Sequence, residues 1–138
     1  MDIENKPRMP IMPPNTVDVS IVIPTYNRLW SLPKAINSCL NSKCKIEIIV
    51  VDDGSADGTW EWLNAQLNIV KIRQKNQGQT YAINAGVLLA KGKYIRFLDS
   101  DDFLNPGTID LQFEAAEDRA ADLVYSGVDV WIEKNGNI

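Results

Sequence analysis

The apolar residues of this chain follow two different spacings, which alternate along its length. Short continuous runs rich in Val and Ile, such as DVSIVI and IEIIVV, predict buried strands. Between these runs, apolar residues recur every three or four positions, a spacing that predicts amphipathic helices. The expected strands are 18–23, 46–51, 69–72, 93–98 and 121–131, and the expected helices are 28–41, 59–67, 77–90 and 106–119.

This alternation indicates an α/β fold with a mostly parallel sheet flanked by helices. Strands that are continuous apolar runs are covered on both faces, and parallel strands need a crossover connection between them. Ligands of such sheets bind outside the carboxyl ends of the strands. We therefore expect the polar segments that follow three of the strands, 24–27, 52–55 and 99–102, to meet in one crevice.

Three carboxylates follow the expected strand 93–98, in the segment Asp99-Ser100-Asp101-Asp102. Neighbouring carboxylates repel one another unless a cation lies between them. Hard divalent ions such as Mg²⁺ and Mn²⁺ take oxygen ligands and are often shared with substrate phosphates. Taken alone, the segment is more typical of a solvated turn with capping aspartates. Its interpretation as a metal site therefore depends on the rest of the chain.

Composition narrows the classes of function. The 138 residues suffice for one domain, and a net charge of −4 argues against nucleic acid as the main partner. No apolar run approaches the roughly 20 residues of a membrane span. The chain has no histidine, which removes a Ser-His-Asp triad and any His-based metal site. Cys39 and Cys44 lack a partner motif, and we expect both to be reduced thiols.

The N-terminal segment differs from the rest. Residues 1–17 are polar and hold four of the seven prolines, so they are expected to form a flexible leader, with one domain over residues 18–138.

Two common nucleotide motifs are absent. Pro24-Thr25-Tyr26 follows the first strand where a dinucleotide fold would carry G-x-G-x-x-G, and no phosphate loop of the form G-x-x-x-x-G-K-[ST] occurs. Phosphates would thus have to be neutralised by a metal held on aspartates.

Five motifs occur in order along the chain. They are VSIVIPTYN at 19–27, VDDGS at 51–55 with DGT at 57–59, NQG at 76–78 with Asn84 and Gly86, KGKYI at 91–95, and LDSDD at 98–102. In this order and at these intervals they resemble family 2 glycosyltransferases of the GT-A fold, over roughly residues 17–131. The fold implied is a Rossmann-like nucleotide-diphospho-sugar transferase domain, of which this chain resembles the N-terminal, donor-binding half.

The resemblance implies roles for individual residues. It places the base and ribose against Pro24, Thr25 and Tyr26, with the Tyr26 ring stacked on the base. Asp53 matches the carboxylate that accepts a hydrogen bond from a uracil N–H. Asp52 either shares that role or braces the turn. The D-x-D motif falls on Asp99-Ser100-Asp101, with Asp101 as the direct metal ligand, Asp99 nearer the ribose and sugar, and Asp102 assisting through water. Arg73 is a candidate donor contact, and Ile83 stands where many relatives carry arginine.

The function implied is metal-dependent, inverting transfer of a hexose from a nucleotide-diphosphate sugar to an acceptor hydroxyl. The expected donor is a UDP-sugar, the cofactor is Mn²⁺ or Mg²⁺, and the acceptor is a glycan, a lipid-linked sugar or a protein. Such an enzyme would serve polysaccharide or cell-surface glycan synthesis. It would be cytoplasmic or peripheral at the inner face of the membrane, and a homodimer is left open. The general base is expected beyond Ile138, in an acceptor-binding part.

Two other functions remain open at this point. The chain could be a non-catalytic module that binds nucleotide sugars. It could also be a sugar-phosphate nucleotidyltransferase, although the glycine- and arginine-rich loop with which such enzymes normally open is absent here.

Overall fold

β1 (Val19–Thr25) lies at the centre of a parallel sheet. It pairs with β2 (Ile46–Asp52) on one side and with β4 (Tyr94–Phe97) on the other. β3 (Val70–Arg73) pairs with the outer edge of β2, so the strand order is β3-β2-β1-β4. This computed structural model describes residues 17–130. All seven residues of β1 are buried, which explains why five of them are apolar.

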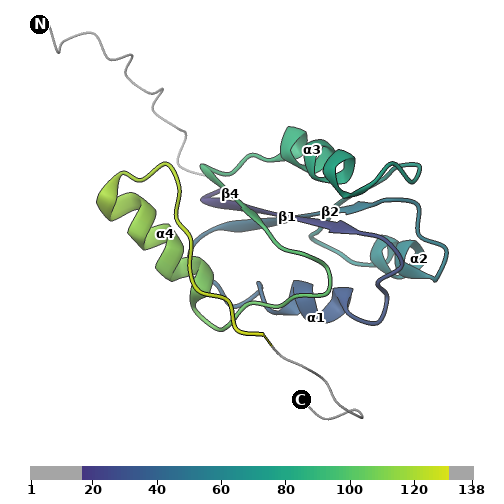
Figure 1. The fold of residues 1–138 in the computed structure, drawn as a ribbon, viewed down its shortest axis with the longest axis horizontal. Coiled ribbons are helices and arrows are strands. Elements are labelled where there is room, and N and C mark those ends of the chain that lie inside the picture. The colour runs from purple at the N-terminus through teal and green to yellow at the C-terminus, as the bar shows by residue number, and fades with distance from the viewer. Residues whose placement is uncertain (1–16, 131–138) are drawn as a thin grey trace, which may run out of the picture.

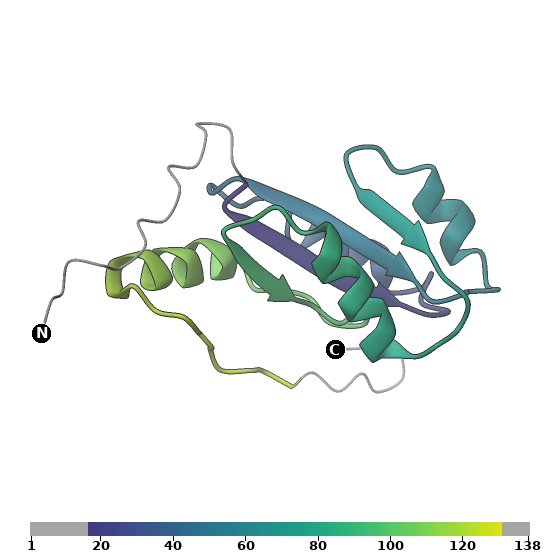
Figure 2. The same ribbon diagram turned by 90° about the horizontal axis from the view of Figure 1, so that it is seen from above.

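Helices cover both faces of the sheet. α3 (Gln79–Leu89) lies on one face, and α1 (Leu32–Asn37), α2 (Thr59–Asn64) and α4 (Thr108–Arg119) lie on the other (Figure 1). Seen from above, α3 runs across the strands (Figure 2). The core divides accordingly into a small cluster under α3 and a larger one under the other three helices. The predicted α/β architecture, a parallel sheet flanked by helices, is confirmed.

The strand register brings the carboxyl ends of β1 and β2 together. Thr25, the last residue of β1, is the register partner of Asp52, the last residue of β2. The backbone continues this pairing, because the Asp53 N–H donates to the Thr25 carbonyl at 2.8 Å. The Leu98 N–H likewise donates to the Val22 carbonyl at 3.1 Å, beyond the end of β4. The polar segments after the three strands therefore leave the sheet at the same edge.

The first helix is shorter than the predicted 28–41. It begins at Leu32. The N–H groups of residues 27–29, ahead of it, donate to side chains of the loop at 52–59 and tie this segment to that loop. Pro33 fits this start, since proline is tolerated only in the first turn of a helix. After Asn37 the N–H groups of Cys39 and Leu40 bond three residues back, which tightens the chain into turns.

The predicted fifth strand, 121–131, is wrong for the residues described. Residues 121–130 are irregular, and Leu123, Tyr125, Val128 and Val130 are more than 80% exposed. The β-branched composition favours a strand, but a strand forms only where a neighbouring strand satisfies its backbone groups. Within residues 17–130 the segment pairs with no strand. Trp131 and residues 1–16, on which the prediction of a leader rests, lie outside the described residues.

None of the helices within residues 17–130 has the length and apolar character needed to cross a membrane.

At Gly86, α3 packs closely against the sheet. A Cβ at this position would lie 2.5 Å from Val22 Cγ1 and 3.2 Å from Val51 Cγ2. Both valines are fully buried, so neither side chain can move aside freely. We expect Gly86→Ala to lower the free energy of unfolding by about 1–3 kcal/mol, despite the better helix propensity of alanine. Urea denaturation measures the change.

The matched control is Asn84→Ala, because Asn84 is exposed on the same helix. It should change the free energy of unfolding by no more than about 0.5 kcal/mol. Equal stability of Gly86→Ala and the wild type would show that α3 does not pack as closely as described.

Candidate functional site

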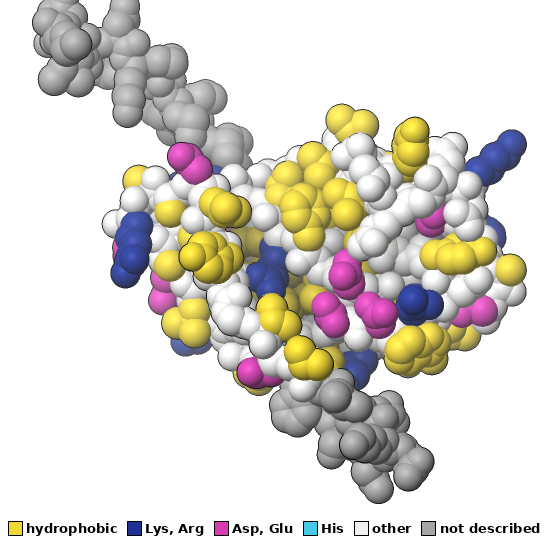
Figure 3. All heavy atoms as spheres, viewed as in Figure 1, with side chains coloured by type: hydrophobic (Ala, Val, Ile, Leu, Met, Phe, Trp, Pro, Cys, Tyr) yellow, Lys and Arg dark blue, Asp and Glu magenta, His cyan; other side chains and the backbone are white. Residues whose placement is uncertain are grey.

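A cavity of about 400 Å³ opens at the carboxyl edge of the sheet, where three strand ends meet. Seven of the predicted site residues line it: Pro24, Thr25 and Tyr26 from β1 and its end, Asp53 after β2, and Asp99, Ser100 and Asp101 after β4. Asn76, Gly78, Gln79, Ala82 and Arg28 complete the lining. On this side of the molecule acidic side chains gather, with a basic side chain beside them (Figure 3). The predicted crevice therefore exists.

A larger cavity of about 770 Å³ lies between β4, α4 and the irregular segment that follows α4. It shares Asp99 and Asp101 with the smaller cavity. Its other walls come from β4, the segment that follows β4, α4 and residues 121–130, and several apolar side chains of residues 121–130 are exposed. The smaller cavity is the candidate site, because polar groups from three separate strands converge there.

Asp53 is buried at the floor of this cavity and accepts three hydrogen bonds. Gln74 Nε2 donates to Oδ1 at 2.7 Å, the Gln77 N–H donates to Oδ1 at 2.9 Å, and the Gly78 N–H donates to Oδ2 at 2.9 Å. Burial raises the pKa of Asp53, but these three donors together hold the pKa below its ordinary value. Asp53 is therefore a carboxylate at neutral pH, and it can only accept hydrogen bonds.

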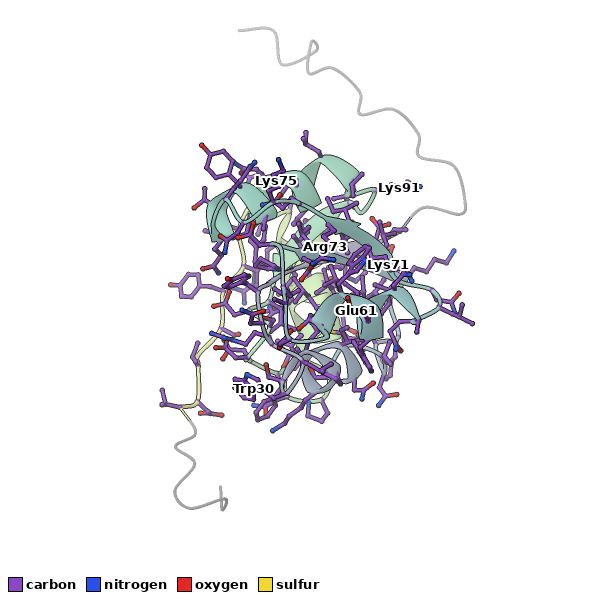
Figure 4. All side chains as sticks on the ribbon, turned by 90° about the vertical axis from the view of Figure 1, so that its right-hand side faces the viewer. Trp30, Glu61, Lys71, Arg73, Lys75 and Lys91 are labelled. Atoms are coloured by element: carbon purple, nitrogen blue, oxygen red, sulfur yellow. The ribbon has the colours of Figure 1, made fainter. Side chains whose placement is uncertain are left out.

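Asp52 and Arg73 do not line the cavity. Asp52 is fully buried, and its Oδ2 lies 3.2 Å from Arg73 Nε. Arg73 Nη2 also donates to the Ser55 carbonyl at 2.6 Å, and its guanidinium lies 5.7 Å from the centre of the Trp60 ring. Figure 4 shows Arg73 projecting from the same strand as Lys71. The pair braces the loop that carries Asp53.

The aspartates after β4 already have protein partners. Gln79 Nε2 donates to Asp99 Oδ1 at 2.8 Å, and Arg28 Nε lies 3.6 Å from Asp101 Oδ2. Burial raises the pKa of Asp102, and the neighbouring charges of Asp101 and Asp99 raise it further. This repulsion is what a bound cation would relieve.

The donor set suits a hard cation that shares its coordination with a ligand. Within residues 17–130 no three carboxylate or thiol side chains converge on one point, so this part of the chain offers no complete cage. Mg²⁺ and Mn²⁺ are commonly held by one or two carboxylates together with substrate phosphates and water. Asp101 and Asp99 fit that pattern, because both reach the cavity.

The sequence did not identify Arg28 or Gln79 as site residues. Both lie just outside the five motifs, and each reaches an aspartate that is distant along the chain. Gln79 begins α3, so only the placement of that helix over the sheet brings it to Asp99. The signal that could have found them is their position directly after the motifs at 19–27 and 76–78.

Comparison with known proteins places this arrangement in a family. The sequence profile described as Glycosyl transferase family 2 matches residues 20–138. Glycosyltransferase GlyG of Streptococcus pneumoniae is 35% identical over 125 residues, which are 86% of this chain and 42% of GlyG. Chondroitin synthase of Escherichia coli is 37% identical over 126 residues, which are 87% of this chain and 18% of the synthase.

Solved structures agree on the fold. The crystal structure of S. aureus TarS residues 1–349 in complex with UDP superposes with a TM-score of 0.71 at 25% identity, over 83% of this chain and 38% of the TarS chain. The chain thus spans less than half the length of the relatives it matches.

The hydrogen bonds to Asp53 predict how stability depends on pH. Because the folded pKa is depressed, the contribution of Asp53 is present above its unfolded pKa of about 3.8 and is lost as pH falls through the folded pKa. We expect Asp53→Asn to be less stable than the wild type by about 1–3 kcal/mol at pH 7. That difference should shrink below about pH 3.8. Urea denaturation of both proteins between pH 7 and pH 2.5 measures it, and a difference that stays constant would contradict the assignment.

Proposed function

The chain belongs to glycosyltransferase family 2, and on that premise we propose that its cavity binds the nucleotide of a UDP-sugar. The observation that carries the proposal is the convergence of Asp53, Tyr26 and the Asp99–Asp101 segment on one cavity. Each of these groups suits a different part of a nucleoside diphosphate. UDP in the similar TarS structure supports the choice of nucleotide.

Asp53 is proposed to recognise the base. A carboxylate has about four lone-pair sites, and three of those on Asp53 are used by Gln74, Gln77 and Gly78. The remaining acceptor site, on Oδ2, suits the N–H of a uracil ring. Tyr26 also lines the cavity and is 45% exposed, so its ring is available to stack on the base.

Asp101 and Asp99 are proposed to hold Mn²⁺ or Mg²⁺ together with the diphosphate. Such an ion, when bound, stabilises the negative charge that develops on a departing nucleoside diphosphate. The chain itself contributes two carboxylates, from the loop that follows β4, and would place them beside the phosphates. Ser100 lies between the two aspartates in the sequence, is buried and also lines the cavity.

The reaction proposed for the complete enzyme is inverting transfer of a hexose. An acceptor hydroxyl of a glycan, a lipid-linked sugar or a protein attacks the anomeric carbon, and the sugar–phosphate bond breaks on the opposite side. A general base takes the proton of the hydroxyl. We assign that role to none of residues 17–130, so the proposal for this chain itself concerns donor binding.

Isothermal titration calorimetry with UDP in the presence of Mn²⁺ tests the site. Loss of a charge-assisted hydrogen bond or of a metal ligand costs about 1.5–3 kcal/mol, so Asp53→Ala and Asp101→Ala should each weaken UDP binding about 10- to 100-fold.

Asp118→Ala is the matched control, because it removes an exposed carboxylate from α4, away from the cavity. Its affinity for UDP should equal that of the wild type. Unchanged affinity in both Asp53→Ala and Asp101→Ala would refute the proposed site.

A further inference from the structure

Arg28 is the sole cationic residue that lines the nucleotide cavity within the described part of the chain. Its Nε lies 3.6 Å from Oδ2 of Asp101, the aspartate proposed as the direct metal ligand. Three carboxylates line the same cavity, those of Asp53, Asp99 and Asp101. A divalent cation would therefore compete with Arg28 for the carboxylate of Asp101.

The backbone around Arg28 is fixed. Three consecutive N–H groups donate to side chains of the loop at 52–59: Asn27 to Ser55 Oγ at 2.8 Å, Arg28 to Thr59 Oγ1 at 3.2 Å and Leu29 to Asp57 Oδ2 at 3.2 Å. The Ala56 N–H donates back to Asn27 Oδ1 at 2.8 Å. Any movement of the guanidinium must then come from rotation of the Arg28 side chain rather than of its loop.

The ion pair between Arg28 and Asp101 costs little to break, so Arg28 can exchange Asp101 for another partner. The two side chains are 40% and 45% exposed, and an ion pair between such exposed groups contributes little to stability. Arg28 also has neighbours on its other side. Its guanidinium lies 5.9 Å from the centre of the Trp30 ring, and its Nη1 donates weakly to the Asn27 carbonyl at 3.4 Å. Trp30 lies at the surface of the molecule (Figure 4) and is 73% exposed.

We propose that Arg28 neutralises Asp101 while no metal is bound, and that it turns to the diphosphate of the nucleotide once a divalent cation takes that carboxylate. The inference rests on the proposed function, because it assumes that a metal and a nucleoside diphosphate share this cavity. It assigns Arg28 as a binding residue for the phosphates, with a second role as a counter-ion.

Charge explains why both roles fit one residue. Without a metal, the cavity holds more carboxylates than cations, and the guanidinium reduces their repulsion. With a divalent cation on Asp99 and Asp101, those two carboxylates are neutralised, and the diphosphate brings new negative charge. A guanidinium binds two phosphate oxygens at once in a fork geometry, which the ammonium group of lysine does not reproduce.

The inference is tested by two binding affinities, for Mn²⁺ and for UDP, which it expects to change in opposite directions. Electron paramagnetic resonance measures free Mn²⁺ during titration of the protein without nucleotide, and calorimetry measures UDP binding at saturating Mn²⁺. Arg28→Ala should bind Mn²⁺ alone about two- to fivefold more tightly, since its competitor is gone. The same variant should bind UDP about tenfold more weakly, since a phosphate contact is lost. Arg28→Lys should leave Mn²⁺ affinity near that of the wild type and still weaken UDP binding.

Lys91→Ala is the matched control for loss of one positive charge. Lys91 is exposed before β4, and Figure 4 shows Lys91 and Trp30 at opposite corners of the molecule. Both affinities of this variant should equal those of the wild type. A thermal melt would show whether Arg28→Ala misfolds. In that case the UDP affinity of Arg28→Lys, which is expected to fall, tests whether Arg28 binds the phosphates.

Three outcomes would overturn the inference. They are a loss of both affinities together in Arg28→Ala, an unchanged UDP affinity in both Arg28 variants, and Mn²⁺ binding too weak to measure in the wild type and in Arg28→Ala. Failure of the wild type itself to bind UDP with Mn²⁺ would be a different result, because it would refute the proposed function.

Discussion

Parallel pairing of β1 with β2 and β4 is the constraint on which the rest of the structure depends. It buries β1 on both faces, so that helices must cover the sheet from two sides. It also sends the chain out of all three strands at the same edge, with Thr25 beside Asp52 in the register. Three polar segments that are far apart in the sequence consequently form one cavity. Within that cavity Asp53 is held in place by hydrogen bonds from Gln74, Gln77 and Gly78.

Two adjacent aspartates at the end of β2 have separate tasks. Asp52 is the last residue of the strand, and its side chain is fully buried against Arg73. Asp53 follows it, accepts bonds from Gln74, Gln77 and Gly78, and reaches the cavity. Successive side chains of an extended strand point to opposite sides, which separates the two carboxylates by one step of the chain. One aspartate holds the loop, and the other lines the cavity.

Sequence reasoning succeeded where the deciding interactions are local or follow from strand direction. The continuous apolar runs fixed four strands to within about two residues, and the residues after them were correctly expected to meet. The strand prediction failed for residues 121–130. Their composition favours a strand, but within residues 17–130 no neighbouring strand pairs with them. Sequence reasoning also could not foresee that Arg73 would brace Asp52 or that Arg28 would reach Asp101, because such pairs form across distances that no sequence spacing encodes. The late start of α1 is a further example, since the N–H groups of residues 27–29 bond to side chains of the loop at 52–59, which are far from them in the sequence.

The most direct test of the proposed site is a crystal structure of this chain with UDP and Mn²⁺. Anomalous scattering at the manganese edge would show whether the loops after the strands bind the metal together with the diphosphate. The expected result is one anomalous peak about 2.0–2.3 Å from an oxygen of Asp101, with the diphosphate on the same ion and the uracil N–H on Asp53. A peak elsewhere on the molecule, or UDP bound away from this edge of the sheet, would contradict the proposed site.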